Sequence, residues 1–268
     1  MIPLASRRFP GLAHRGPALF LFVLLLLPVM TLLSACRSQH QEQEHQLQGS
    51  VLGTGYHLTL YADLDERERE TLKVGIQGEL AYIERQSDLL LAALGLAFAP
   101  YPAWLANAPQ SLMDELARLL HAAAVDRLTR HLKAQGMQSA LVELGGMVRT
   151  LGAPPGRDWT LSLAHVGLPG NGEVSHVTLR DAALVQRPAS RNGSEALDDH
   201  RVLGVSVVAA TASEAQHQAL RLTTGNGRAQ ASAHGGVVAV DSAARLVVET
   251  PQGIEILNTT ALEPWLVR

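Results

Sequence analysis

The chain has a single cysteine, Cys36, among its 268 residues, so it can form no internal disulfide bond. It also lacks an excess of positive charge, since 22 lysines and arginines stand against 25 aspartates and glutamates. This balance gives no reason to expect a nucleic-acid partner, because phosphate backbones attract clustered basic side chains. A domain without disulfides must be stabilised by an ordinary hydrophobic core, and the chain is long enough for one.

Generic catalytic signatures are missing as well. The sequence contains no phosphate-binding loop with its lysine, no dinucleotide-binding glycine fingerprint, no HExxH zinc motif and no GxSxG nucleophile motif. Its histidines are scattered, and a lone histidine is usually a surface or core residue. Any function must therefore be inferred from a less general pattern.

The N-terminus has the features of a bacterial export leader. Three arginines precede an apolar run over residues 18–33 that is short for a membrane-spanning helix. The run ends in Leu33-Ser34-Ala35-Cys36, a lipobox pattern of small residues before the cysteine that receives lipid. We therefore expect residues 1–35 to be a signal peptide, and lipid on Cys36 to hold the protein on a membrane that faces the periplasm or the cell exterior. The alternative is an uncleaved signal anchor with an incidental cysteine.

The mature chain is expected to be a polar tether over 36–48 followed by one domain over 49–268. Apolar residues at three- and four-residue steps predict helices, and short apolar runs predict strands. The predicted helices cover 65–91, 114–135 and 213–223. The predicted strands lie within 47–61, on both sides of a turn at 53–55, and over 139–144, 159–166, 174–179, 202–209, 236–241, 246–249 and 253–257. Because strands and helices do not alternate strictly, the predicted class is α+β, with a mixed sheet and packed helices.

Several short motifs follow one another in a distinctive order. Leu52-Gly53-Thr54 lies in the first turn, Phe98 follows the first helix, the second helix carries Glu115 to Asp126, and a strand ends at Gly145-Gly146. In this order and spacing, residues 48–260 resemble the FAD:protein FMN transferases of the ApbE family. Members of that family are exported and often lipid-anchored. They split FAD with a magnesium ion and attach FMN to a Thr or Ser of a partner protein.

The resemblance implies one ApbE-like domain and a set of flavin-binding positions. Leu52 stands where the family has a methionine, Glu115 falls on its flavin-binding aspartate, and His121 falls on its lysine. Val125-Asp126-Arg127 matches the end of the family's helix motif. The implied FAD-binding residues are Leu52, Gly53, Thr54, Phe98, Glu115, His121, Asp126, Gly145 and Gly146.

The chain departs from the family where the family's chemistry lies. Ala99 stands in place of a carboxylate that touches FAD, and Val185-Gln186-Arg187-Pro188 stands in place of Ala-Thr-Ser-Gly. In the metal motif Ala-Asp-x-x-x-Thr, Gln216 replaces the aspartate and Leu220 replaces the threonine. A neutral amide and an alkyl group cannot hold magnesium as a carboxylate and a hydroxyl do. No family metal ligand is intact, and magnesium binding is not expected.

Three functions remain open at this point. The first is an exported lipoprotein with a degenerate, weakly active or inactive transferase-like domain, which acts as a flavin-binding or accessory factor for membrane redox proteins. The second is an active magnesium-dependent FAD:protein FMN transferase whose metal is held by Glu214 or Asp198. The third is an unrelated structural or assembly lipoprotein in which the motif order is coincidental. The loss of family ligands favours the first, which implies FAD as ligand and a flavin-carrying redox protein as partner.

Overall fold

The computed structural model describes residues 42–93, 110–164, 166, 175–189, 201–223 and 242–267. The predicted leader with Cys36, the expected flavin contact Phe98, and the strand predicted over 236–241 lie outside the described residues. In the part of the chain that is described, no helix combines the length and the apolar character needed to cross a membrane.

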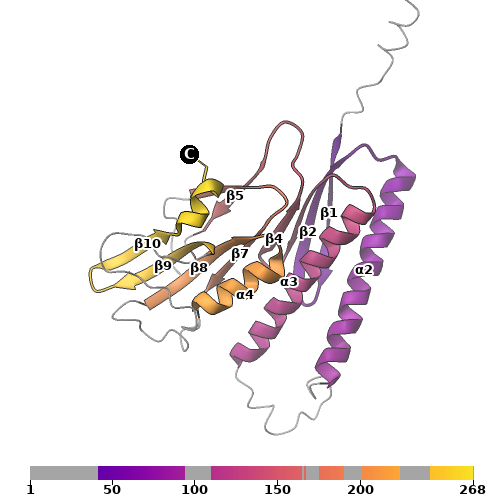
Figure 1. Cartoon of the computed structure of the whole chain (residues 1–268). Helices are drawn as coiled ribbons and strands as arrows, with labels where there is room; N and C mark the ends of the chain where they lie inside the picture. The colour runs from indigo at the N-terminus through magenta and orange to yellow at the C-terminus, as the bar shows by residue number, and fades with distance from the viewer. Residues whose placement is uncertain are drawn as a thin grey trace, which may run out of the picture. The chain divides into compact units, whose positions relative to one another are not determined.

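An eight-stranded sheet organises the domain (Figure 1). In spatial order its strands are β1 (Gln43–Val51), β2 (Thr54–Ala62), β3 (Ser139–Leu144), β4 (Met147–Leu151), β7 (Ala183–Pro188), β8 (Arg201–Ala209), β9 (Ala243–Thr250) and β10 (Gly253–Asn258). All neighbours pair antiparallel, so the α+β class is confirmed but the sheet is antiparallel rather than mixed. Two-residue turns such as the one between β3 and β4 permit this pairing directly.

Three helices cover one face of the sheet (Figure 1). α3 (Gln110–Ala134) packs on β3 and β4, and α4 (Ala212–Thr223) packs on β7 and β8. α2 (Glu66–Ala93) lies outside α3 and runs in the opposite direction. Because α2 and α3 lead the chain out and back, β3 can start at the end of the sheet where β2 stopped and pair with it antiparallel.

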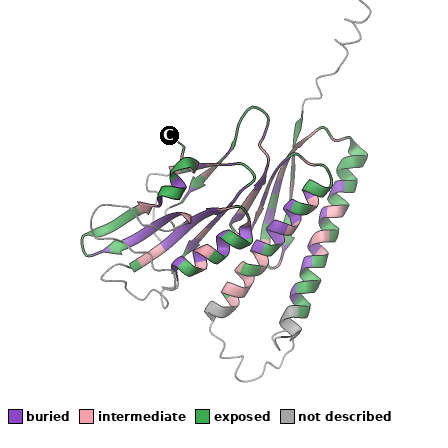
Figure 2. Cartoon of the chain, in the orientation of Figure 1, coloured by how far each residue is buried: buried purple, intermediate pink, exposed green. Residues whose placement is uncertain are grey.

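The main core lies between these helices and the sheet. Figure 2 shows the buried stripe that each helix turns inward. In α2 this stripe consists of the residues whose spacing predicts the helix: Leu72, Ile76, Leu80 and Ile83. Because α2 is exposed on its other side, one apolar stripe is enough to hold it.

A second, smaller core lies on the opposite face of the sheet. β5 (Trp159–Leu163) and β6 (Ser175–Leu179) form a separate antiparallel pair that packs there with the 3-10 helix η1 (Thr260–Trp265). Leu184 of β7 belongs to this second core, whereas its neighbour Val185 belongs to the main core. This alternation directs the side chain of Arg187, two residues after Val185, toward the helices.

β1 begins at Gln43, within the segment 36–48 that the sequence predicts to be a polar tether. It pairs with β2 along its whole length, from Gln43 opposite Ala62 to Val51 opposite Thr54. As an edge strand it leaves most of its side chains exposed, so polar residues are tolerated there. The composition of β1 therefore resembles that of a linker, although every residue of the strand is in register with a partner in β2.

Candidate functional site

The β1–β2 turn is tied to α3 by a histidine. Leu52 and Gly53 both have positive φ angles, 51° and 73°, as a two-residue hairpin turn with the right twist requires. The carbonyl oxygen of Leu52 lies 3.3 Å from Nε2 of His121 and, as it can only accept, Nε2 carries the proton. Burial lowers the pKa of His121 below its ordinary value, so the ring is held neutral near pH 7.

The same ring packs against the β3–β4 turn. Gly145 has a φ angle of 59°, and a Cβ atom placed on it would lie 2.5 Å from Nδ1 of His121. Only glycine combines this backbone conformation with such a close approach. The structure thus brings together Leu52, His121 and Gly145, three of the predicted site residues, whereas Gly53 and Gly146 turn toward open space.

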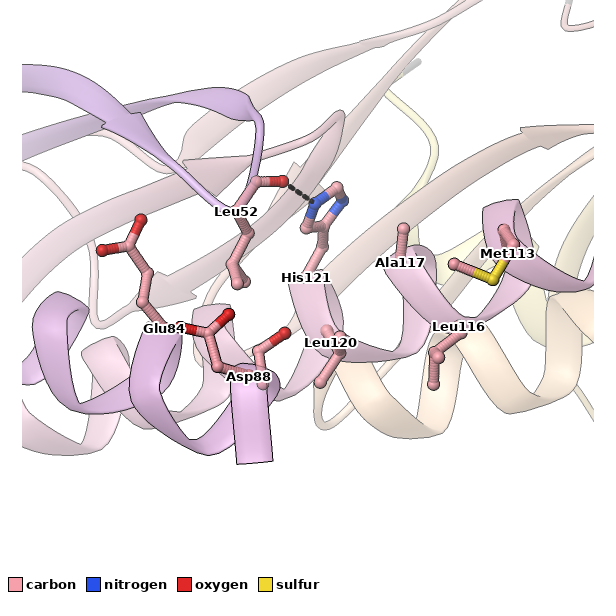
Figure 3. Close-up of a pocket in the computed structure, with 9 residues that line it drawn as sticks. Leu52, Glu84, Asp88, Met113, Leu116, Ala117, Leu120 and His121 are labelled. Atoms are coloured by element: carbon pink, nitrogen blue, oxygen red, sulfur yellow. Dashed lines mark hydrogen bonds between the residues drawn. The ribbon is translucent and has the colours of Figure 1, made fainter. Parts of the chain in front are cut away.

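A cavity of about 470 Å³ opens beside this contact, between α2, α3 and the β1–β2 turn (Figure 3). Its lining is largely apolar, and the polar part consists of two carboxylates and a serine from α2 and the His121 ring. The lining residues are Leu52, Glu84, Ser87, Asp88, Met113, Leu116, Ala117, Leu120 and His121. A cavity of this size and character is typical of sites for small molecules.

A second polar cluster lies where α3, β7 and α4 meet. Nη1 of Arg187 donates to Oε2 of Glu115 at 2.7 Å, and Nε2 of Gln216 donates to Oε1 of the same carboxylate at 2.8 Å. Gln216 is fully buried, and the Arg187 side chain is only 7% exposed. Glu115 therefore uses both of its oxygens on neighbours within the protein.

Asp126 is buried and has a structural role in the observed contacts. Its Oδ1 accepts from the backbone N–H of Ala212 at 2.8 Å and from Nη1 of Arg149 at 2.7 Å. Its Oδ2 accepts from the backbone N–H and the hydroxyl of Ser213, at 3.0 and 2.6 Å. Asp126 thus caps the N-terminus of α4 from a distant part of the chain. It does not line the cavity, and its implied contact with FAD stays a prediction.

Comparisons with known proteins agree with this architecture. Residues 112–186, which include His121, Asp126 and Gly145, match the model of the ApbE family. The described fold is that of solved ApbE structures. The chain therefore has an ApbE-like fold.

Three of these solved structures are similar over most of their length. The flavin transferase ApbE from Vibrio cholerae is 15% identical, with a TM-score of 0.58, over 84% of this chain and 100% of that one. The flavinyl transferase ApbE from Pseudomonas stutzeri, in its apo form, is 16% identical, with a TM-score of 0.57, over 84% and 97%. The ApbE protein from Thermotoga maritima is 14% identical, with a TM-score of 0.58, over 84% and 100%. No curated protein sequence gives a significant match.

The metal position of the ApbE-like domain does not fit magnesium. Gln216 offers one neutral amide oxygen and directs its amide nitrogen to Glu115, while the positively charged Arg187 binds that same carboxylate. Leu220 contributes no side-chain oxygen. Among the described residues no group of three or more His, Cys, Asp or Glu is placed to hold a metal ion. Hard divalent cations require several oxygen ligands and carry no affinity for a guanidinium.

The alternative ligand Glu214 does not join this cluster. It is exposed on α4, where its carboxylate accepts a hydrogen bond from Gln218 at 3.3 Å. Gln216, two residues on, is completely buried. Two helical residues point about 200° apart, so the Glu214 side chain faces away from Glu115. The other suggested ligand, Asp198, lies outside the described residues.

Sequence reasoning missed two parts of the site. Glu84, Ser87 and Asp88 line the cavity from α2, and their spacing of three and four residues places them on one helix face. That spacing is visible in the sequence, but the packing of this helix face beside α3 is not. Arg187 was noted only as a departure from the family pattern, and its link to Glu115 spans 72 residues of sequence.

Proposed function

We propose that this ApbE-like protein is an exported lipoprotein, anchored through Cys36, that binds flavin without carrying out magnesium-dependent FMN transfer. It serves membrane redox proteins as a flavin-binding or accessory factor. The observation that carries the proposal is the fully buried amide of Gln216, which donates a hydrogen bond to Glu115 at the position where the family has a metal-binding aspartate. Splitting a pyrophosphate relies on metal charge, and these side chains supply no ligand set for it.

The cavity between α2 and α3 supports flavin binding. It lies beside Leu52 and His121, both at positions that the resemblance assigns to the flavin site, and its walls are apolar side chains. An isoalloxazine ring is a flat, uncharged body that suits such a lining. Among the described lining residues, Glu84 and Asp88 are the only acidic or basic side chains apart from His121, so a phosphate near them is repelled. The site therefore favours the ring end of a flavin over its phosphates.

The absence of FMN transfer activity is tested by incubating the purified protein with FAD, magnesium chloride and an acceptor protein that carries the target threonine. We expect no fluorescent FMN on the acceptor after denaturing electrophoresis, whereas an active ApbE transferase run in parallel labels it. Covalent FMN on the acceptor would refute the proposal.

Flavin binding is tested separately by titrating riboflavin with the protein and following quenching of its fluorescence. Leu120 lines the cavity, and the adjacent Leu119 is 42% exposed and does not. We expect Leu120→Glu to weaken binding at least tenfold and Leu119→Glu to leave it unchanged. Equal effects of both substitutions, or no quenching by the unmodified protein, would show that the cavity is not a flavin site.

A further inference from the structure

Arg187 is a buried cation that the proposed function leaves unexplained. It lies on β7, on the side of the sheet that faces α3 and α4, and its side chain is 7% exposed. A guanidinium that is removed from water needs an anion and hydrogen-bond acceptors. Glu115 of α3 provides the anion at 2.7 Å. The pair carries no net charge, so the junction of the three elements is electrically balanced.

The carboxylate of Glu115 is shared between two elements. Its second oxygen accepts from Gln216 of α4 at 2.8 Å. The cluster thus joins a helix, a strand and a second helix through one carboxylate. A divalent metal ion joins carboxylates from separate elements in the same manner, by attraction to all of them at once.

The cluster is also incompletely bonded. Nε of Arg187 and Oε1 of Gln216 are buried, and neither has a hydrogen-bond partner among the described residues. Unpaired buried groups are destabilising, so a polar cluster fully adapted to its members leaves few of them. The cluster therefore has one unpaired donor and one unpaired acceptor. This favours the interpretation that its side chains occupy a site whose geometry suited another group, such as a metal ion.

We propose that the guanidinium of Arg187 is a built-in cation that takes the place of a divalent metal ion beside the Glu115 carboxylate, to which Gln216 also binds. Together with Glu115 and Gln216 it joins α3, β7 and α4, and its positive charge prevents a metal ion from binding there. The inference rests on the proposed loss of magnesium-dependent transfer and adds a cause for it. The metal position lacks ligand side chains, and in addition the positive charge of Arg187 occupies it.

The proposal is tested by restoring metal ligands with and without Arg187. Leu220 lies four residues after Gln216, on the same face of α4, so Gln216→Asp with Leu220→Thr places a carboxylate and a hydroxyl side by side. Three full-length proteins are compared: the unmodified chain, Q216D/L220T, and Q216D/L220T with Arg187→Ser. Magnesium chloride alone is the probe, and the readouts are calorimetric heat and the shift in melting temperature on adding magnesium.

We expect the unmodified chain and Q216D/L220T to show neither heat nor a shift. We expect the triple variant to bind magnesium and to melt at a higher temperature when magnesium is present, because a ligand that binds only the folded state stabilises it. Replacing Arg187 with Lys instead of Ser keeps the positive charge and should abolish the effect. Arg187→Met, which retains the apolar volume, replaces the serine variant if that protein does not fold.

The outcomes separate the two proposals. If Q216D/L220T binds magnesium as tightly as the triple variant, or if the folded triple variant binds none, Arg187 is not a substitute cation, while the proposed function stands. If the unmodified chain binds magnesium, the proposal that metal-dependent transfer is lost is wrong, and the inference about Arg187 fails with it.

Discussion

Replacing Asp126 with alanine should destabilise the domain more than a typical core substitution. The carboxylate is 4% exposed and accepts hydrogen bonds from four donors, three of them at the N-terminus of α4. Removing one partner of a buried ion pair costs about 3–5 kcal/mol, and the lower end applies here because Arg149 is 17% exposed and can reach water. Losing a helix cap adds about 1 kcal/mol.

The expected loss for Asp126→Ala is therefore about 4 kcal/mol, a large part of the roughly 5–15 kcal/mol that stabilises a folded protein. Asp126→Asn retains one acceptor oxygen and loses the charge and the second acceptor, so we expect about half of that loss. Urea denaturation of the purified proteins, followed by far-ultraviolet circular dichroism, measures both values. In a thermal scan the alanine variant should melt roughly 8–16 °C lower.

Asp158→Ala is the matched control, because this aspartate also pairs with an arginine, Arg180, but is 45% exposed. Surface pairs of this kind contribute roughly 0–1 kcal/mol. A loss below about 1 kcal/mol for Asp126→Ala, equal to that of the control, would refute the assignment of Asp126 as the residue that fixes α4 to α3 and β4.

Three further predictions concern the turns and the cavity. Because burial lowers the pKa of His121 from its ordinary 6.5, its neutral form stabilises the fold fully above that pH and progressively less as the pH falls below it. Urea midpoints measured from pH 8 to 5 should fall less for His121→Gln, and parallel curves would contradict this. Gly145→Ala should lower the free energy of unfolding by about 1–2 kcal/mol for its left-handed backbone, and further for the clash with His121. With the ring removed by His121→Ala only the backbone cost remains, so Gly145→Ala should lower the melting temperature less in the His121→Ala protein than in the unmodified one. An equal drop in both would refute the contact. Glu84→Gln with Asp88→Asn should strengthen binding of FAD relative to riboflavin in fluorescence titrations, since both carboxylates repel phosphate. An unchanged ratio would show that they do not face the phosphates.

Periodicity and turn residues predict most of the local structure. The apolar spacing of α2 and α4 places these helices to within two residues at each end, because one buried stripe determines each of them. β4 was missed because Gly145-Gly146 was interpreted as the end of a strand. A two-residue glycine turn is equally the centre of a hairpin, and the apolar residues Met147 and Val148 that follow it continue the sheet.

The site could be predicted only in part. Positions near a turn, such as Leu52 and Gly145, are recognisable because glycine marks the left-handed backbone that the turn requires. The contacts among Glu115, Arg187 and Gln216 depend instead on the packing of three elements that are far apart in sequence. No local sequence pattern encodes that packing. Until its partner is located, a polar residue in a buried strand cannot be recognised as functional and resembles a neutral substitution.

The spatial order of the sheet has a consequence for how this domain can change in length. β2 and β3 lie side by side, yet α2 and α3 are inserted between them in the chain, and α4 is inserted in the same way between β8 and β9. Each insertion leaves and rejoins the sheet between two strands that are already neighbours. Residues can therefore be deleted from, or added to, these connections without any strand changing its partner or its register. Evolution can rebuild the helical layer, where the cavity lies, while the sheet beneath it is inherited intact.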